Sequence, residues 1–124
     1  MQQPSTANFQ QILDTVTDYW SPRVVGRVND QYIKVAKLKG EFTWHWHDAE
    51  DELFLVVYGS LTIQFEHSSV RLGPGEFYVV PKGTLHNPVA MEECGIVLIE
   101  TVTTQHTGGV ESPLTKSIER QLLG

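Results

Sequence analysis

The chain has 124 residues, a formal net charge of -6 and a single cysteine, Cys94. A chain of this length can bury a core without cross-links, and one cysteine cannot form an intrachain disulfide. The acidic balance argues against nucleic acid or an anionic membrane surface as a partner. There is no apolar run of about 18 residues that would span a bilayer, and the first residues do not resemble a signal peptide. We therefore expect a single cytoplasmic domain over residues 1–124.

A helix is predicted near the N-terminus. Apolar residues follow the spacing of one helical face at Phe9, Ile12, Leu13, Val16 and Trp20. Ser5, Thr6 or Asn8 could cap this helix, and Ser21-Pro22 would end it.

Short apolar segments separated by Gly, Pro, Asn, Asp and Ser residues follow the predicted helix. The expected strands cover residues 24–28, 31–39, a segment containing His45 and His47, 53–57, 61–66, 70–72, 77–80, 85–87 and 96–102. Close spacing of short strands is typical of an all-β sandwich or barrel. A second short helix is predicted near the C-terminus, with Ser112 as cap, Pro113 at its first position, and an apolar stripe at Leu114, Ile118 and Leu122.

Residues 40–59 contain three potential metal ligands. His45 and His47 are two positions apart, so in an extended strand both imidazoles point to the same face. Glu52 begins the next apolar segment after a short polar turn, and Asp51 is the alternative carboxylate if the strand register shifts by one. His86, just beyond a tight turn, could reach the same place in a closed barrel. Three imidazoles and a carboxylate suit Fe(II), Mn(II), Ni(II), Co(II), Cu(II) or Zn(II).

Two patterns in the chain resemble the cupin motifs. Gly40-x4-His45-x-His47-x4-Glu52-x6-Gly59 resembles the first, and Gly75-x5-Pro81-x-Gly83-x2-His86 resembles the second. Residues 39–45, 51–54 and 79–83 are similar to small single-domain bacterial cupins described as mannose-6-phosphate-isomerase-like.

The resemblance implies a double-stranded β-helix, or jelly-roll barrel, with a motif-bearing core at about residues 24–103. It also implies one divalent metal ion held by His45, His47, Glu52 and His86, and frequently a homodimer. Two positions depart from the family pattern. Four residues rather than five precede the first histidine. Ala90 stands where the second motif usually has Asn, and Asn87 is the candidate to substitute for it.

Other residues near these motifs have roles outside the set of metal ligands. By strand alternation Trp44 and Trp46 point away from the histidines and form a packing face. Phe54, Val56 and Tyr58 share the face of Glu52. Tyr58 and His106 are weak candidates for a catalytic acid or base. His67 is expected at the surface, and Cys94 reads as inert because no basic residue nearby would lower its pKa.

Two classes of function remain open at this point. One is a metalloenzyme of the oxygenase, isomerase or lyase type acting on a small oxygen-bearing molecule. The other is a non-catalytic module that binds or senses such a molecule, and the fold alone does not decide between them. An isomerase of sugar phosphates would need a basic residue at the cavity, for which only Lys82 and Arg71 are candidates. Both are more simply surface residues.

Overall fold

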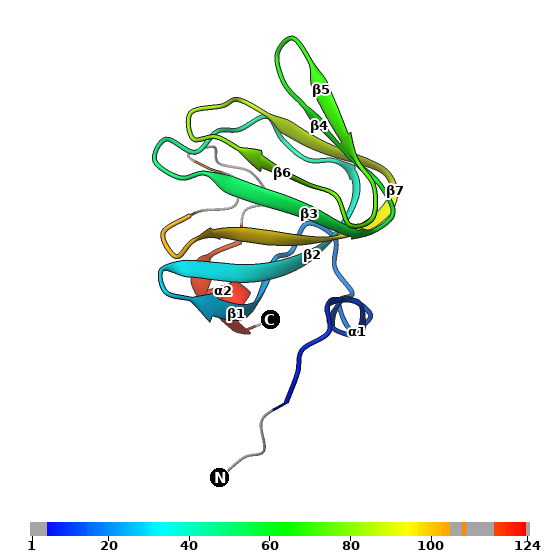
Figure 1. Ribbon diagram of the computed structural model, residues 1–124, viewed down its shortest axis with the longest axis vertical. Helices are drawn as coiled ribbons and strands as arrows, with labels where there is room; N and C mark the ends of the chain where they lie inside the picture. Colours follow the sequence, from blue (N-terminus) through cyan, green and yellow to red (C-terminus); the bar gives the residue numbers. More distant parts are fainter. Residues whose placement is uncertain (1–4, 105–107, 109–115, 124) are drawn as a thin grey trace.

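The computed structural model describes residues 5–104, 108 and 116–123. Within these residues the chain forms seven strands and two short helices (Figure 1). The strands are β1 (Arg23–Val28), β2 (Gln31–Glu41), β3 (Glu52–Tyr58), β4 (Leu61–Gln64), β5 (Ser69–Leu72), β6 (Phe77–Val80) and β7 (Asn87–Thr101), and the helices are α1 (Phe9–Leu13) and α2 (Ile118–Leu123). Neither described helix is long and apolar enough to cross a bilayer.

The strands pair in antiparallel fashion and curve into a jelly-roll barrel. The main sheet has the order β1-β2-β7-β3-β6, and β4 pairs with both β5 and β7. The first residues of β7 pair with β4, whereas its second half lies between β2 and β3. In Figure 1 β7 bends at one side of the molecule and so belongs to both parts of the sheet. The predicted all-β jelly-roll barrel is confirmed.

The barrel core follows from the period-two alternation of its strands. Along β3, Glu52, Phe54 and Val56 are buried while their neighbours are partly exposed, because successive side chains point to opposite faces. The buried core residues inside the barrel are Ala36, Leu38, Phe54, Val56, Leu61, Ile63, Leu72, Val80, Ala90, Cys94, Ile96 and Leu98. Burial raises the pKa of the Cys94 thiol to about 12, so this side chain is protonated and weakly nucleophilic at neutral pH.

Helix α1 is shorter than predicted. Asn8 caps it by accepting a hydrogen bond from Gln11 N, and the helix ends at Leu13. The prediction that Trp20 continues the helical face is wrong. Trp20 N donates to Lys37 O (2.8 Å), and its indole Nε1 donates to Lys39 O (2.9 Å). The residues after Leu13 include β-branched and aromatic side chains with low helix propensity, and these contacts with β2 outweigh the helical pattern.

The strand predictions need two corrections. Residues 42–51 form no named strand, and His45 makes only an isolated bridge with His86. The strands predicted at 85–87 and 96–102 are not separate: the end of the first and nearly all of the second belong to one strand, β7 (Asn87–Thr101). Its middle residues, 91–93, are exposed and partly acidic, and they lie where the register with β2 shifts between Leu38 and Gly40. The apolar pattern is therefore interrupted at an irregularity within one strand. Of the predicted C-terminal helix, residues 112–114 lie outside the described residues, and α2 begins at Ile118.

Candidate metal centre

Backbone pairing brings His45 and His86 face to face. His45 N donates to His86 O (3.0 Å), and His86 N donates to His45 O (2.9 Å). In such an antiparallel pair the two side chains lie on the same face, and the imidazole centroids are 4.3 Å apart. His47, two residues further on, is held by a third backbone bond from Gly83 N to His47 O (2.7 Å).

The turn before His86 is tied to the loop that carries the other two histidines. Gly83 has a φ of +77°, a left-handed conformation that glycine adopts without steric cost. Lys82 N donates to Asp51 Oδ1 (2.9 Å). Asp51 is therefore an exposed residue that fixes this turn, and it is not part of the buried cluster. Glu52, the first residue of β3, points inward instead.

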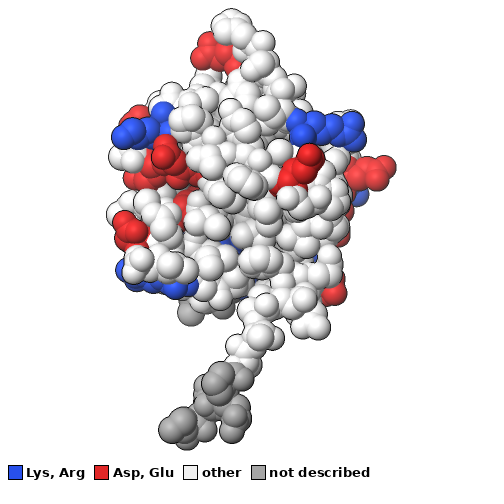
Figure 2. Space-filling model, in the orientation of Figure 1, with Lys and Arg blue, Asp and Glu red and all other residues white. Residues whose placement is uncertain are grey.

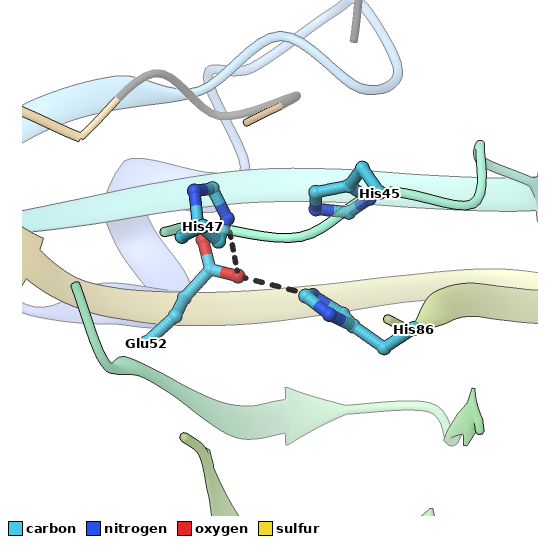
Figure 3. A group of neighbouring side chains, drawn as sticks. All are labelled: His45, His47, Glu52 and His86. Atoms are coloured by element: carbon cyan, nitrogen blue, oxygen red, sulfur yellow. Dashed lines mark ion pairs between the residues drawn. The ribbon is translucent and has the colours of Figure 1, made fainter. Parts of the chain in front are cut away.

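Four side chains converge inside the barrel (Figure 3). Ligand atoms of His45, His47, Glu52 and His86 all lie within 4.8 Å of one another, and all four residues are buried. Glu52 Oε1 is 3.4 Å from His47 Nε2 and 3.5 Å from His86 Nε2. These separations exceed the usual length of a hydrogen bond between nitrogen and oxygen. The group is thus a cluster that could bind a metal.

The tautomers of two histidines suit metal binding. His45 Nδ1 lies 2.8 Å from Thr43 O, and His86 Nδ1 lies 2.8 Å from Thr84 O. A carbonyl oxygen only accepts, so each Nδ1 carries a proton, and in the neutral imidazole Nε2 is then the nitrogen with the free lone pair. Within the described part of the chain no hydrogen bond reaches Nε2 of the three histidines or Oε1 of Glu52. Each such buried, unpaired atom costs about 1–3 kcal/mol, a cost that a shared cation would offset.

The electrostatics agree with this donor set at His45 and Glu52. Burial, assisted by His86, lowers the pKa of His45 to about 4, so its imidazole is neutral at neutral pH. Burial by itself would raise the pKa of Glu52, but the neighbouring Glu100, His47 and His86 hold that pKa well below its usual range. Burial also opposes a charge on His47, but the contact with Glu52 outweighs it and raises the pKa of His47.

Two buried charged residues beside this cluster were missed in the sequence. Lys34 on β2 and Glu100 on β7 have no exposed side-chain area, and Lys34 Nζ is 2.7 Å from Glu100 Oε1. Glu100 is the direct register partner of Glu52 across β7 and β3. Strand alternation could have found both, because Lys34 follows the inward Tyr32 by two positions and Glu100 follows the inward Leu98 by two.

An apolar cavity of about 30 Å³ adjoins the cluster at His45 and Glu52. Its other lining residues are Trp20, Pro22, Ala36, Leu38, Phe42, Phe54, Pro88, Ile96 and Leu98. Trp20 stacks on Phe42, with centroids 4.7 Å apart and planes 12° apart, and Phe42 meets the His45 ring edge-on at 5.4 Å. The volume suits roughly two water molecules, so a ligand here would be small.

The structure does not bring Tyr58 to this cavity. A β-bulge between Val56 and Tyr58 adds one residue and reverses the alternation. Tyr58 therefore packs on the outer side of the sheet with Leu13, and its hydroxyl donates to Glu93 Oε2 (2.7 Å). The prediction that Tyr58 shares the face of Glu52 is wrong. His106, the other weak candidate, lies outside the described residues.

The remaining predicted positions are as follows. Trp44 and Trp46 point away from the cluster as predicted, with 39% and 41% of their surface exposed. His67 is at the surface, as predicted. Asn87 is buried, and its Nδ2 donates to Glu41 Oε1 (2.8 Å) and Gln64 Oε1 (3.2 Å), so it links β7 to β2 and β4.

Comparison with known proteins agrees with this geometry. Residues 32–101, more than half of the chain, match the family described as "Cupin domain". The chain belongs to the cupin family. This cupin is similar to a solved cupin-2 domain containing protein from Shewanella frigidimarina, with 44% identity and a TM-score of 0.75, covering 77% of this chain and 93% of that one.

Two further relatives are similar over much of their length. A solved protein from Neisseria meningitidis is 33% identical with a TM-score of 0.71, covering 78% of this chain and 99% of that one. The uncharacterized protein YdbB of Bacillus subtilis (strain 168) is 34% identical over 80 residues, which are 64% of this cupin and 71% of YdbB. These likenesses support the barrel and leave the function of this cupin to be inferred from its site.

Proposed function

We propose that this cupin binds one divalent transition-metal ion inside its barrel and holds a small oxygen-bearing ligand beside it. The ligands are His45 Nε2, His47 Nε2, His86 Nε2 and Glu52 Oε1. One observation carries the proposal: these four buried atoms converge within 4.8 Å, and no described residue offers any of them a hydrogen bond. Fe(II), Mn(II), Ni(II), Co(II), Cu(II) and Zn(II) all accept such mixed nitrogen and oxygen ligands.

The charge and shape of the site indicate the class of ligand. Three neutral imidazoles, one carboxylate and a divalent ion sum to about +1, which favours an anionic or chelating oxygen group. The cavity beside His45 and Glu52 is otherwise lined by apolar side chains and backbone. A carboxylate or other chelating oxygen group with a very short apolar body suits this combination of charged centre and small apolar cavity.

A sugar-phosphate substrate is poorly supported. Among the described residues that line the cavity there is neither lysine nor arginine, one of which a phosphate would need. Lys82 and Arg71 are both exposed. Lys82 lies in the turn that is fixed by the hydrogen bond from its backbone N to Asp51. The likeness to mannose-6-phosphate-isomerase-like cupins therefore does not carry that activity to this chain.

Two classes of function are compatible with this site. In an enzyme of the oxygenase, isomerase or lyase type, the ion would supply Lewis-acid or redox chemistry to a bound substrate. Apart from His45 and Glu52, the described lining residues have no side chain that could act as an acid or base near neutral pH, which favours the alternative of a binding or sensing module. Oxygen uptake and product formation, measured with small acids, thiols and diols on metal-loaded protein, separate the classes. If the protein retains one of these compounds unaltered and turns over none of them, the result supports the binding or sensing module.

Tag-free protein purified without chelator is expected to contain about one transition-metal ion per chain. The reason is that an ion satisfies four buried donor atoms at once. Elemental analysis of protein purified from cells checks this stoichiometry and identifies the metal. Metal-free protein that takes up no ion from a panel of these six divalent metals would contradict the proposal.

We also infer that this cupin forms a homodimer through the outer face of β3 and β6. On that face Phe77 is 60% exposed and Val79 is 43% exposed, and Figure 2 shows few charged side chains over the middle of the side that it draws. On the apolar side of α1, Leu13 is fully buried against the sheet of its own chain, so it does not contribute to such an interface.

The dimer is tested by sedimentation. The parent chain is expected to sediment as a dimer at micromolar concentration, and Phe77→Glu as a monomer, because a carboxylate would be buried unpaired in the interface. Met91→Glu is the matched control, since Met91 is an exposed apolar residue on β7, and it should remain dimeric. A monomeric parent, or dimeric Phe77→Glu, would rule this interface out.

A further inference from the structure

The wall of the apolar cavity reaches the surface at two aromatic rings. Of the described residues that line the cavity, Trp20 and Phe42 are partly exposed and all the others are buried. The two rings stack with their centroids 4.7 Å apart and their planes 12° apart, and Phe42 meets the His45 ring edge-on at 5.4 Å. On this side of the barrel the stacked pair therefore lies between the cavity and solvent.

Trp20 comes to the cavity from outside the family core. The match to the cupin family covers residues 32–101, and among the described lining residues only Trp20 and Pro22 lie outside that range. Both belong to the segment that joins α1 to β1. The size of the cavity is therefore set in part by a segment that the family match does not include.

The backbone at Trp20 is held in an unfavourable conformation. Its φ is +55°, a left-handed value that a bulky aromatic residue rarely adopts. Trp20 N donates to Lys37 O (2.8 Å), and Nε1 donates to Lys39 O (2.9 Å), so β2 fixes both the backbone and the ring. Strained residues that the surrounding structure holds in place are concentrated at functional sites, and the indole of this one lines the cavity.

We propose that Trp20 is a specificity-determining residue, whose indole closes the cavity beside His45 and limits a carboxylate ligand to about the size of acetate. The inference rests on the proposed function and goes beyond it by naming the residue that sets the size of the ligand. The cavity of about 30 Å³ holds roughly two water molecules. While the indole is in place, there is no room for a longer aliphatic chain.

The test uses formate, acetate, propionate and butyrate as ligands of the Co(II)-loaded protein. Coordination of a carboxylate changes the visible absorption of Co(II), so each titration gives a Kd. Trp20→Gly removes the indole, and glycine adopts a φ of +55° without steric cost. Trp20→Asn is a second truncation, because asparagine tolerates the left-handed conformation better than other residues with a side chain.

The parent is expected to bind formate and acetate and to discriminate against butyrate. In both variants the ratio of butyrate affinity to acetate affinity should rise by roughly 15-fold, because two more CH₂ groups are buried and each is worth about fourfold. A purely structural role for Trp20 would weaken all four carboxylates alike and leave this ratio unchanged. Tyr19→Gly is the control, since Tyr19 is the neighbouring aromatic residue, is 41% exposed and does not line the cavity.

The outcomes separate this inference from the proposed function. If Trp20→Gly and Trp20→Asn keep the ratio of the parent, the indole does not limit ligand size and the inference is overturned. If Tyr19→Gly raises the ratio as much, loosening of the segment is the cause and the inference also fails. If the Co(II)-loaded parent and variants bind none of the four carboxylates, the proposed ligand is wrong. A parent that binds no Co(II) overturns the metal site. In both of these last cases the role of Trp20 fails as well.

Discussion

His86→Ala is expected to lower affinity for a divalent transition ion by more than the 10–100-fold that loss of an outer-shell partner costs. The variant removes one of four converging donor atoms and leaves Glu52 Oε1 without its contact to His86 Nε2 at 3.5 Å. Protein purified in parallel with the parent should therefore contain little metal. Elemental analysis and Co(II) titration of the metal-free protein measure the loss.

His67→Ala is the control for this variant. The His67 side chain is 94% exposed and contacts only Glu66 at 4.0 Å among the described ion pairs, so its removal should leave the metal content unchanged. His86→Ala also opens space in the interior, so its fold is checked by circular dichroism before the metal content is compared. Stoichiometric metal in folded His86→Ala would exclude this histidine as a ligand.

Glu100→Leu alone is expected to lower the free energy of unfolding of the metal-free protein by roughly 3–5 kcal/mol. The substitution leaves the Lys34 ammonium buried, with 0% of its side chain exposed, and without its partner at 2.7 Å. An unpaired charge in the interior loses its hydration without compensation. Urea unfolding in the presence of a chelator measures the change.

The double variant Lys34→Met/Glu100→Leu should recover most of that loss, because no charge is then left unpaired. Glu66→Leu is a surface control for the same change of side chain, since 63% of the Glu66 side chain is exposed, and its stability should stay close to that of the parent. If the double variant is at least as unstable as Glu100→Leu, the buried charge is not the cause of the loss.

Several features of the site could be predicted from local sequence. Alternation around residues 44–47 places both histidines on one side and both tryptophans on the other, and burial in the structure follows that pattern. The turn at 81–83 carries Gly83 in its left-handed conformation and leads directly to His86. These features depend on side-chain period and turn chemistry, which act over only a few residues.

Other features depend on contacts between distant parts of the chain. Trp20 follows a helical pattern, yet it leaves the helix because β2 offers hydrogen bonds to its backbone and indole. Tyr58 follows a strand pattern, yet a single bulge turns it to the opposite face. Neither the partner strand nor the bulge can be read from the residues nearby.

By itself, the sequence determined the strand-rich class of this cupin and the identity of four residues that converge inside it, because ligand type and strand period are local properties. Only the tertiary structure decided which other charged residues are buried beside these four. Lys34 and Glu100 are 66 positions apart in the chain, the difference of their numbers, and they meet only because β2 and β7 pair. A charged residue on a strand is ordinarily read as exposed, and it can be buried here because a partner from another strand compensates its charge.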